Sequence, residues 1–216
     1  MLTVWGRKNS FNVQKVMWLI GELGLQYHMI PFGGRFGNCD TEEFAAINPT
    51  RHIPVISLND RIVWESHTIL RFLAASSDQN AFWPNDPLER AHRECWMDWC
   101  QTALEPDLMM GVFWGLIRTP EPERDWATIN EQVARCSHHF EILEAILSQQ
   151  PFLSGQHFGL ADIPTGATLY RYFSLDIERP AIPAVKAWYQ RLQSRPAYRE
   201  HVMVSYDDLR GQRIRR

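Results

Sequence analysis

Hydrophobic and polar positions divide the start of the chain into a short strand, a turn and a helix. Leu2–Gly6 has strand-like content, and the stretch 9–25 carries apolar residues at the spacing of one helical face. Ser10 lies where this helix would begin and Gly24 where it would end, as is typical of helix caps. The apolar face consists of Val13, Val16, Met17, Ile20 and Leu23. The pattern therefore predicts strand, tight turn and helix, with a hydroxyl group at the turn.

Short strands and helices continue to alternate as far as Ser76. Two strand-like runs flank Asn59–Asp60, a pair typical of a hairpin turn. Pro54 lies at the beginning of the first run, where it removes a hydrogen-bond donor, and a cis Ile53–Pro54 bond would explain its place. The predicted order is βαβαββα. Its later elements are a strand over 26–32, a helix over 41–47, strands over 53–58 and 61–64, and a helix over 65–76.

The pattern changes at 77–87, where prolines and turn-forming residues predict a linker. Beyond it strand signals all but vanish. The clearest helical periodicity runs from Trp126 to Leu147, and we interpret its apolar stripe as a core helix. A helix over 88–104 is expected to kink or break at Pro106, which donates no backbone hydrogen bond. We predict an α/β domain over 1–77, a linker over 78–87 and an all-helical domain over 88–216.

Composition narrows the range of functions. The 216 residues are 45% hydrophobic with a net charge of −3, which gives no support to nucleic-acid binding. No apolar run approaches the ~18 residues of a membrane span, and the N-terminus lacks a signal-peptide pattern. The four cysteines have no C-x-x-C spacing. We therefore expect a cytoplasmic protein with reduced thiols and no metal, whose partners are neither membranes nor nucleic acids.

Three places carry candidate chemistry, and each also has a structural explanation. Ser10 lies at a helix N-terminus, which favours an anion, although its spacing alone favours a plain cap. Glu65 and Ser66 open another helix and, taken alone, are also typical capping residues. The glycine-rich loop 33–40 lacks the Gly-Lys-Ser/Thr ending of a phosphate cradle, so we interpret it as a mobile connection.

Five motifs lie in register along nearly the whole chain: S-F-N-V-Q-K-V…E-L-G-L at 10–25, I-N-P-T-R-H-I-P-V-I at 47–56, W-E-S-H-T-I at 64–69, L-A-D-I-P-T-G at 160–166 and I-P-A-V-K-A-W-Y-Q-R-L-Q-S-R-P-A-Y at 182–198. Together they resemble the cytosolic glutathione transferases, in particular the bacterial theta-like and Nu-like branches of serine or asparagine type. The resemblance implies a thioredoxin-like α/β N-terminal domain with a mixed sheet, followed by an all-α helical bundle.

The resemblance also implies a site for glutathione, whose parts suit particular residues. Glu65 would pair with the ammonium of the γ-glutamyl end, and Ser66 with its own N–H would hold the neighbouring carboxylate. A cis bond at Pro54 would turn the backbone of Ile53 outward to pair with the cysteinyl part. His52 would reach the glycine carboxylate, whereas by itself it would be interpreted as a surface histidine.

The glutathione thiol decides the chemistry. A free thiol has a pKa of about 8.5 and is mostly protonated at neutral pH, so the site needs a donor that favours the thiolate. Ser10 is at the family's hydroxyl position, and Asn12 is a second donor two residues on. We favour Ser10 with Asn12 assisting, and the reverse stays open. Because neither residue is cysteine, a mixed disulfide on the enzyme, as in omega-like members, is not expected.

The resemblance implies a function and partners as well. We expect an enzyme that adds glutathione thiolate to a hydrophobic electrophile or reduces a peroxide or disulfide with it. The alternative is a non-catalytic binding or regulatory protein of the same fold. We also expect a homodimer. By fold analogy, an electrophile pocket is expected on the second domain, and ordinary core packing explains the same residues equally well. The pocket candidates are Met109, Phe113 and Trp114.

One motif departs from the family's pattern. Its first position usually holds serine or threonine as a helix cap, and here it holds Gly159. Glycine is a tolerable cap, and the Asp162 side chain can still reach back to the Gly159 N–H. We therefore expect some loss of stability with the fold retained.

Overall fold

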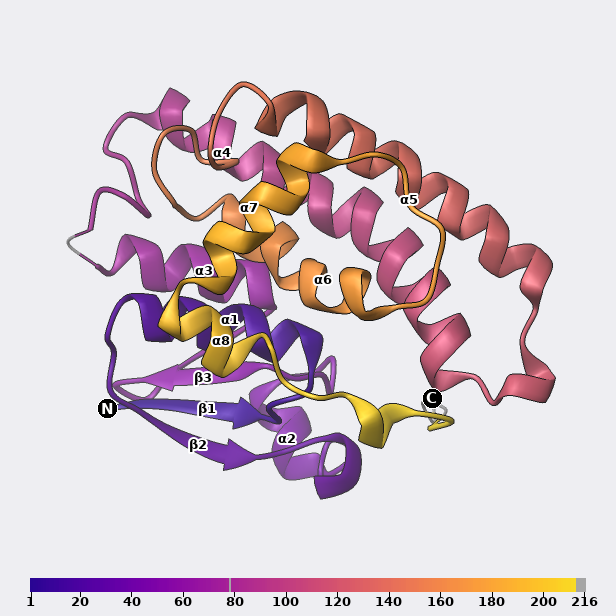
Figure 1. Cartoon of the computed structure of the whole chain (residues 1–216). Helices are drawn as coiled ribbons and strands as arrows, with labels where there is room; N and C mark the ends of the chain where they lie inside the picture. The colour runs from indigo at the N-terminus through magenta and orange to yellow at the C-terminus, as the bar shows by residue number, and fades with distance from the viewer. Residues whose placement is uncertain (78, 213–216) are drawn as a thin grey trace. The chain divides into compact units, whose positions relative to one another are not determined.

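The computed structural model describes residues 1–77 and 79–212, and they form two compact units (Figure 1). The first unit contains Met1–Trp83 together with Pro196–Val204. The second contains Pro84–Arg195 together with the residues from Ser205 on. Position 78 of the predicted linker and positions 213–216 of the predicted helical domain lie outside the described residues. The domain boundaries of the previous section stay predictions.

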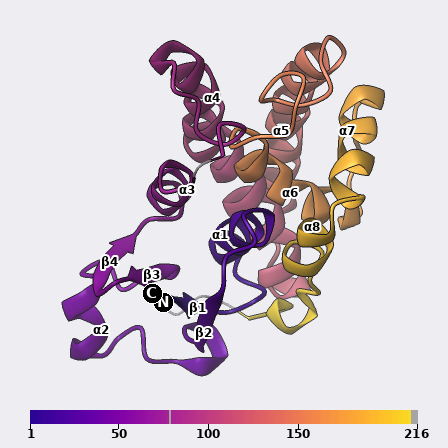
Figure 2. The ribbon, with the colours of Figure 1, turned by 90° about the vertical axis from the view of Figure 1, so that its left-hand side faces the viewer.

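The first unit has the predicted βαβαββα order around one mixed sheet. Its strands lie in the order β2-β1-β3-β4, with β1 parallel to β2 and antiparallel to β3. Figure 2 shows α1 and α3 over one face of this sheet and α2 over the other. The thioredoxin-like fold class is thus confirmed. The elements are β1 (Leu2–Gly6), α1 (Phe11–Glu22), β2 (Tyr27–Pro31), α2 (Glu42–Ile47), β3 (Val55–Leu58), β4 (Arg61–Trp64) and α3 (Ser66–Ala75).

Local sequence explains how these elements begin and end. Gly24 has φ +64° after the last turn of α1, and the Leu25 N–H donates to the Ile20 carbonyl at 3.1 Å, which is the bonding of a Schellman C-cap. Asn59 and Asp60 both have positive φ, as a two-residue hairpin turn between antiparallel strands requires. The Ile53–Pro54 bond is cis, as predicted.

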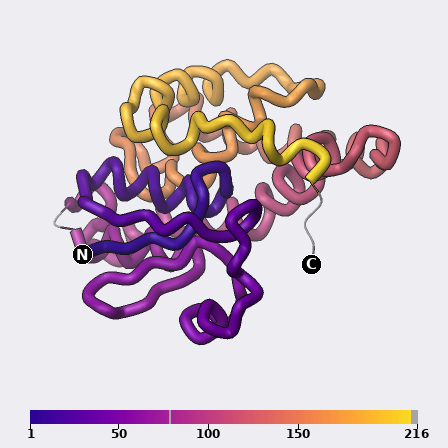
Figure 3. Tube along the Cα trace, turned by 90° about the horizontal axis from the view of Figure 1, so that it is seen from below, coloured from indigo at the N-terminus to yellow at the C-terminus, as the bar shows by residue number. Residues whose placement is uncertain are grey.

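Helix α1 is buried on every side and not only along its predicted stripe. All eight residues from Val13 to Ile20 are buried, because α3 and α8 (Pro196–His201) both pack against α1. Figure 3 shows α8 running beside α1. Trp18 meets Tyr198 of α8 edge to face at 4.7 Å between ring centroids. Polar side chains between Val13 and Ile20 are therefore held inside the fold, wherever on the helix they point.

The regular elements of the second unit are all helices over the residues that the structure describes, and loops connect them, one of which contains an isolated bridge between Phe152 and Gly155. Of the kink or break expected at Pro106, the break does not occur. Glu105 keeps helical angles, φ −63° and ψ −43°, and the flanking segments have π-type hydrogen bonding, which accommodates the missing donor. The elements are α4 (Pro87–Trp99), η2 (Cys100–Leu104), η3 (Pro106–Arg118), α5 (Trp126–Leu147), α6 (Asp162–Ser174) and α7 (Pro183–Gln193).

Asp162 is a buried hub of the second unit. Its carboxylate accepts the Gly159 N–H at 3.0 Å, so the predicted reach-back across the motif is confirmed. It also accepts the N–H groups of Leu153 at 2.8 Å and Ser154 at 3.3 Å and the indole N–H of Trp188 at 3.1 Å. Burial raises the pKa of Asp162, and these hydrogen bonds act against that shift. The hub joins the loop before α6 to α7.

Candidate functional site

The register of the sheet brings the predicted glutathione residues to one of its ends. Trp5 in β1 pairs with Val55 at the start of β3, and Val55 pairs with Trp64 at the end of β4. The segments attached to these three strand ends therefore lie at the same end of the sheet, where α1 and α3 also begin. The residues on these segments are Ser10, Asn12, His52, Ile53, Pro54, Glu65 and Ser66.

Ser10 is the N-cap residue of α1, with φ −78° and ψ 123°, but its side chain makes no capping hydrogen bond. Its N–H donates to the Arg7 carbonyl at 3.0 Å, which closes the turn after β1. The residue is half-buried, whereas Asn12 in the first turn of α1 is exposed. The simple explanation of Ser10 as a side-chain cap therefore does not account for its hydroxyl group.

Glu65 and Ser66 begin α3 in an unusual conformation. Glu65 is the N-cap residue with φ +68°, a region that costs a non-glycine residue about 1–3 kcal/mol. Its side chain is exposed and makes no capping bond, whereas Ser66 is buried. Such outliers cluster at ligand-binding sites. The N-cap side chains of α1 and α3, Ser10 and Glu65, thus make no capping hydrogen bond.

The segment before β3 presents backbone groups outside the sheet ladder. Among the described residues, neither the N–H nor the carbonyl of Ile53 takes part in a backbone–backbone hydrogen bond. Pro54 is buried and holds the start of β3. His52 is exposed; its ring Nδ1 contacts the Thr50 carbonyl, and its own carbonyl accepts from the Asn48 side chain at 2.8 Å. This segment can therefore pair with an extended peptide-like ligand.

The sequence did not predict that a lysine would be buried next to this end of the sheet. Lys15 of α1 has no exposed surface, and its Nζ lies 3.1 Å from the Nε2 of His67, which is also buried. The same Nζ lies 4.5 Å from the centroid of the Phe11 ring. Position 15 lies off the apolar stripe, so helical periodicity would place it in solvent. The only sequence signal is a lone lysine in an otherwise mostly apolar helix.

The candidates for an electrophile pocket all lie on η3 in the second unit. Met109 and Phe113 are buried, and Trp114 is half-buried. The Phe113 ring contacts Tyr206 edge to face at 4.9 Å, and the Arg171 guanidinium lies 4.7 Å from the same ring. Core packing thus accounts for Phe113 as the structure stands. A role in substrate binding stays a proposal.

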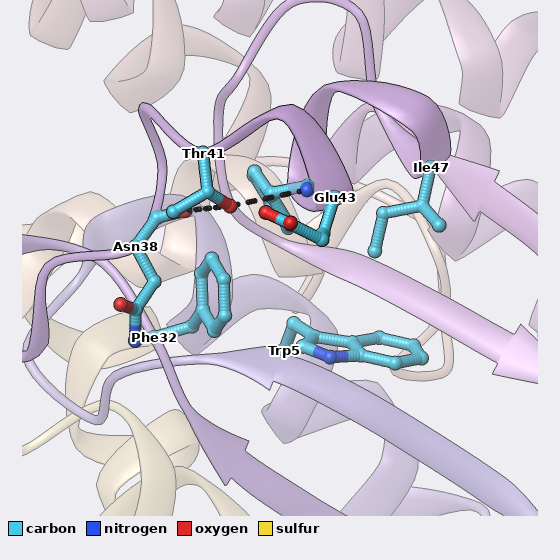
Figure 4. A pocket seen from close by; sticks show the side chains of 7 residues that line it. Trp5, Phe32, Asn38, Thr41, Glu43 and Ile47 are labelled. Carbon is cyan, nitrogen blue, oxygen red and sulfur yellow. Dashed lines mark hydrogen bonds between the residues drawn. The ribbon is translucent and has the colours of Figure 1, made fainter.

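A cavity of about 320 Å³ lies elsewhere in the first unit, between β1 and α2 (Figure 4). Thr41 caps α2 beside it, because its hydroxyl accepts the Phe44 N–H at 3.2 Å and donates to the Asn38 carbonyl at 3.1 Å. None of the predicted glutathione residues lines this cavity. Its walls are Trp5, Phe32, Asn38, Thr41, Glu43, Phe44 and Ile47.

Membrane-spanning helices and clusters of metal-binding side chains are both absent from the part of the chain that the structure describes. No helix there combines the length and apolar character that a membrane crossing demands. No group of three or more metal-binding side chains comes together there either.

Comparisons with known proteins identify the family of this chain. Residues 9–76 match the model of the glutathione S-transferase N-terminal domain, and residues 106–196 match that of the C-terminal domain. The chain is 39% identical to glutathione S-transferase GstB of Escherichia coli over 94% of this chain and 99% of that protein. It is 27% identical to the disulfide-bond oxidoreductase YfcG of Escherichia coli over 86% of this chain and 87% of that one.

A solved structure is similar over nearly its full length. The theta class glutathione S-transferase of Xanthomonas axonopodis pv. citri, with glutathione bound, superposes with a TM-score of 0.90. It is 42% identical in sequence and covers 94% of this chain and 98% of its own. Both the fold and the order of the two units are therefore shared with a glutathione-binding protein.

Proposed function

Because the chain belongs to the glutathione S-transferase family, it is a glutathione transferase with glutathione as its co-substrate, and we propose that Ser10 holds the glutathione thiol as a thiolate. The observation that carries this proposal is the Ser10 hydroxyl, which makes no capping bond although it is half-buried at the N-terminus of α1. A hydroxyl in that place can donate to a sulfur atom, and the helix N-terminus favours its negative charge.

The neighbouring segments are proposed to bind the rest of the glutathione molecule. Glu65 pairs with the γ-glutamyl ammonium, and Ser66 at the start of α3 binds the neighbouring carboxylate through its hydroxyl and N–H. The backbone of Ile53 beside cis-Pro54 pairs with the cysteinyl part, as its lack of ladder bonds allows. His52, which is exposed next to it, reaches the glycine carboxylate.

The chemical step needs only the thiolate and an electrophile. The sulfur lone pair attacks an electrophilic carbon, an S–C bond forms, and either a leaving group departs with its electron pair or the product takes up a proton. Lowering the thiol pKa by about one and a half units corresponds to roughly 2 kcal/mol of preference for the thiolate. Ser10 supplies this preference, and the exposed Asn12 assists from the first turn of α1.

A second activity has a specific reason to be tested. The relative YfcG is named a disulfide-bond oxidoreductase, at 27% identity. In such a reaction the glutathione thiolate attacks one sulfur of a disulfide and expels the other as a thiolate, and a second glutathione releases oxidised glutathione. Ser10 and Asn12 stand where omega-like members place cysteine, so this step proceeds between bound molecules without a mixed disulfide at those positions.

The remaining features are the binding place of the electrophile and the oligomeric state. We place a hydrophobic electrophile against the second unit near Met109, Phe113 and Trp114, as family analogy suggests. The protein is proposed to act as a cytoplasmic homodimer.

Purified protein should bind glutathione and turn over a panel of hydrophobic electrophiles, peroxides and small disulfides. Ser10→Ala should lower kcat about tenfold or more while leaving the affinity for glutathione nearly unchanged, because only the thiolate loses its donor. Asn12→Ala, the matched control on the same turn, should have a smaller effect. An Asn12→Ala variant that loses more activity than Ser10→Ala would transfer the role to Asn12. A protein that binds no glutathione would be the non-catalytic alternative.

A further inference from the structure

We propose that Lys15 is a positioning residue whose buried positive charge, set behind the first turns of α1 and α3, favours the thiolate form of bound glutathione. This inference rests on the proposed function, because it concerns the same site. It adds a charge that lies inside the fold to the donors that line its surface. Three features of the described residues support it: where the Lys15 ammonium lies, what it contacts and how completely it is buried.

The ammonium lies near the beginning of α1, although Lys15 itself is in the second turn. Side chains on a helix lean towards its N-terminus, so Lys15 reaches back over the residue four positions earlier. That residue is Phe11, the first of α1, and the Nζ lies 4.5 Å from the centroid of its ring. Ser10 precedes Phe11 directly. The charge is therefore at the level of the turn that carries the proposed thiolate donor.

The same ammonium also lies close to the beginning of α3. Its Nζ lies 3.1 Å from the Nε2 of His67, the second residue of α3, directly after Ser66. An ammonium group only donates hydrogen bonds, so it donates to Nε2 in the tautomer of His67 that leaves this nitrogen free to accept. The contact joins the second turn of α1 to the first turn of α3. One cation is thus shared by both proposed anion sites.

The charge lies at the positive end of two helices. A helix N-terminus carries partial positive charge and favours an anion, and Lys15 has no exposed surface. An anion bound at this end of the helices therefore meets the helix N-termini and the Lys15 charge together. Because the charge is buried, it acts through protein and is only weakly screened by salt. The arrangement suits a site that stabilises a bound anion.

Other charged groups on the elements packed against α1 do not duplicate this one. Strands β1 and β3 contain no ionisable side chain, and α3 contributes Arg71 besides His67. Helix α8 contributes Arg199, Glu200 and His201, and burial lowers the pKa of His201, which keeps it neutral near pH 7. Lys15 is the cation that these elements enclose completely.

The test measures the pKa of glutathione bound to the full-length protein, from the ultraviolet absorbance of the thiolate as pH is varied. At a separation of ~10 Å and an effective dielectric constant of ~20, removing one charge corresponds to roughly one pKa unit. Lys15→Met, which keeps length and apolar volume, should therefore raise the thiol pKa by about one unit. At a pH below both values, kcat should fall about tenfold, with a smaller change in KM for glutathione.

Two further variants separate charge from hydrogen bonding and from packing. Lys15→Gln removes the charge and keeps a donor for His67, so it should raise the thiol pKa as Lys15→Met does; it also serves if Lys15→Met fails to fold. His67→Gln keeps the charge and an acceptor, so the thiol pKa should stay at the wild-type value. Lys15→Met should unfold at an equal or higher temperature than wild type, because replacing a buried charge by an apolar side chain is often stabilising.

The outcomes distinguish this inference from the proposed function. A bound thiol that titrates like free glutathione in the wild-type protein would overturn both. A lowered thiol pKa in wild type that is retained in Lys15→Met and Lys15→Gln would overturn only the role of Lys15. A raised value in Lys15→Met with a wild-type value in Lys15→Gln would assign the effect to the hydrogen bond and would also contradict the inference.

Discussion

Replacing Asp162 should destabilise the protein more than replacing almost any other single side chain. The Asp162 carboxylate is fully buried and accepts four N–H groups at 2.8–3.3 Å, three from the backbone and one from Trp188. A buried donor left without an acceptor costs about 1–3 kcal/mol. Relief of the desolvated carboxylate offsets part of this sum, because burial raises the pKa of Asp162 and so disfavours its charged form.

The expected loss for Asp162→Ala is therefore roughly 3–5 kcal/mol of unfolding free energy, a large part of the ~5–15 kcal/mol typical of a folded protein. Asp162→Asn should cost about half as much. Its single oxygen can keep the bonds from Leu153 and Trp188, while its amide group faces the N–H groups of Ser154 and Gly159.

Urea unfolding followed by tryptophan fluorescence measures both variants. The matched control is Asp125→Ala, which removes an exposed cap whose carboxylate accepts the Thr128 N–H at 3.1 Å, and it should cost far less. A loss below about 1 kcal/mol for Asp162→Ala would refute the hub, since even one orphaned buried donor costs that much. Equal losses for the alanine and asparagine variants would refute the assignment of bonds to the two oxygens.

Three other predictions follow from the first unit. Glu65→Gln should raise KM for glutathione several-fold with little change in kcat, and an unchanged KM in steady-state kinetics would remove Glu65 from the ammonium site. Gly24→Ala should cost about 1 kcal/mol in urea unfolding, because φ +64° disfavours a Cβ; an unchanged midpoint would contradict the C-cap. Burial lowers the pKa of His201, so the unfolded chain binds more protons and stability should fall as pH drops through about 6.5. His201→Gln should flatten that part of the pH profile of unfolding; an unaltered slope would exclude His201 as its source.

Local patterns predicted the order of the first unit well, because its turns and caps use residues with narrow conformational preferences. Asn59–Asp60 can form the tight hairpin turn, and Gly24 can adopt the positive φ of a C-cap. The chain does not break at Pro106, because the segments on both sides stay helical with π-type hydrogen bonding, a pattern that the local rule for proline in an α-helix does not cover.

The residues proposed to line the candidate site could be predicted from the sequence, whereas the buried lysine behind them could not. Ser10, Pro54 and Glu65 each carry a local signal, and the strand register, which the structure supplies, brings them to one end of the sheet. Lys15 gave no such signal, because periodicity within α1 assigns only one buried face. Its burial depends on α3 and on α8, which arrives from far along the chain.

The pKa of the glutathione thiol bound to the wild-type protein tests the central claim most directly. A titration of the thiolate absorbance, with free glutathione as the reference, measures it without assuming an electrophile. The account predicts a value about one and a half units below the ~8.5 of a free thiol, and a return most of the way towards that value in Ser10→Ala. A bound thiol that titrates with the pKa of free glutathione would contradict it.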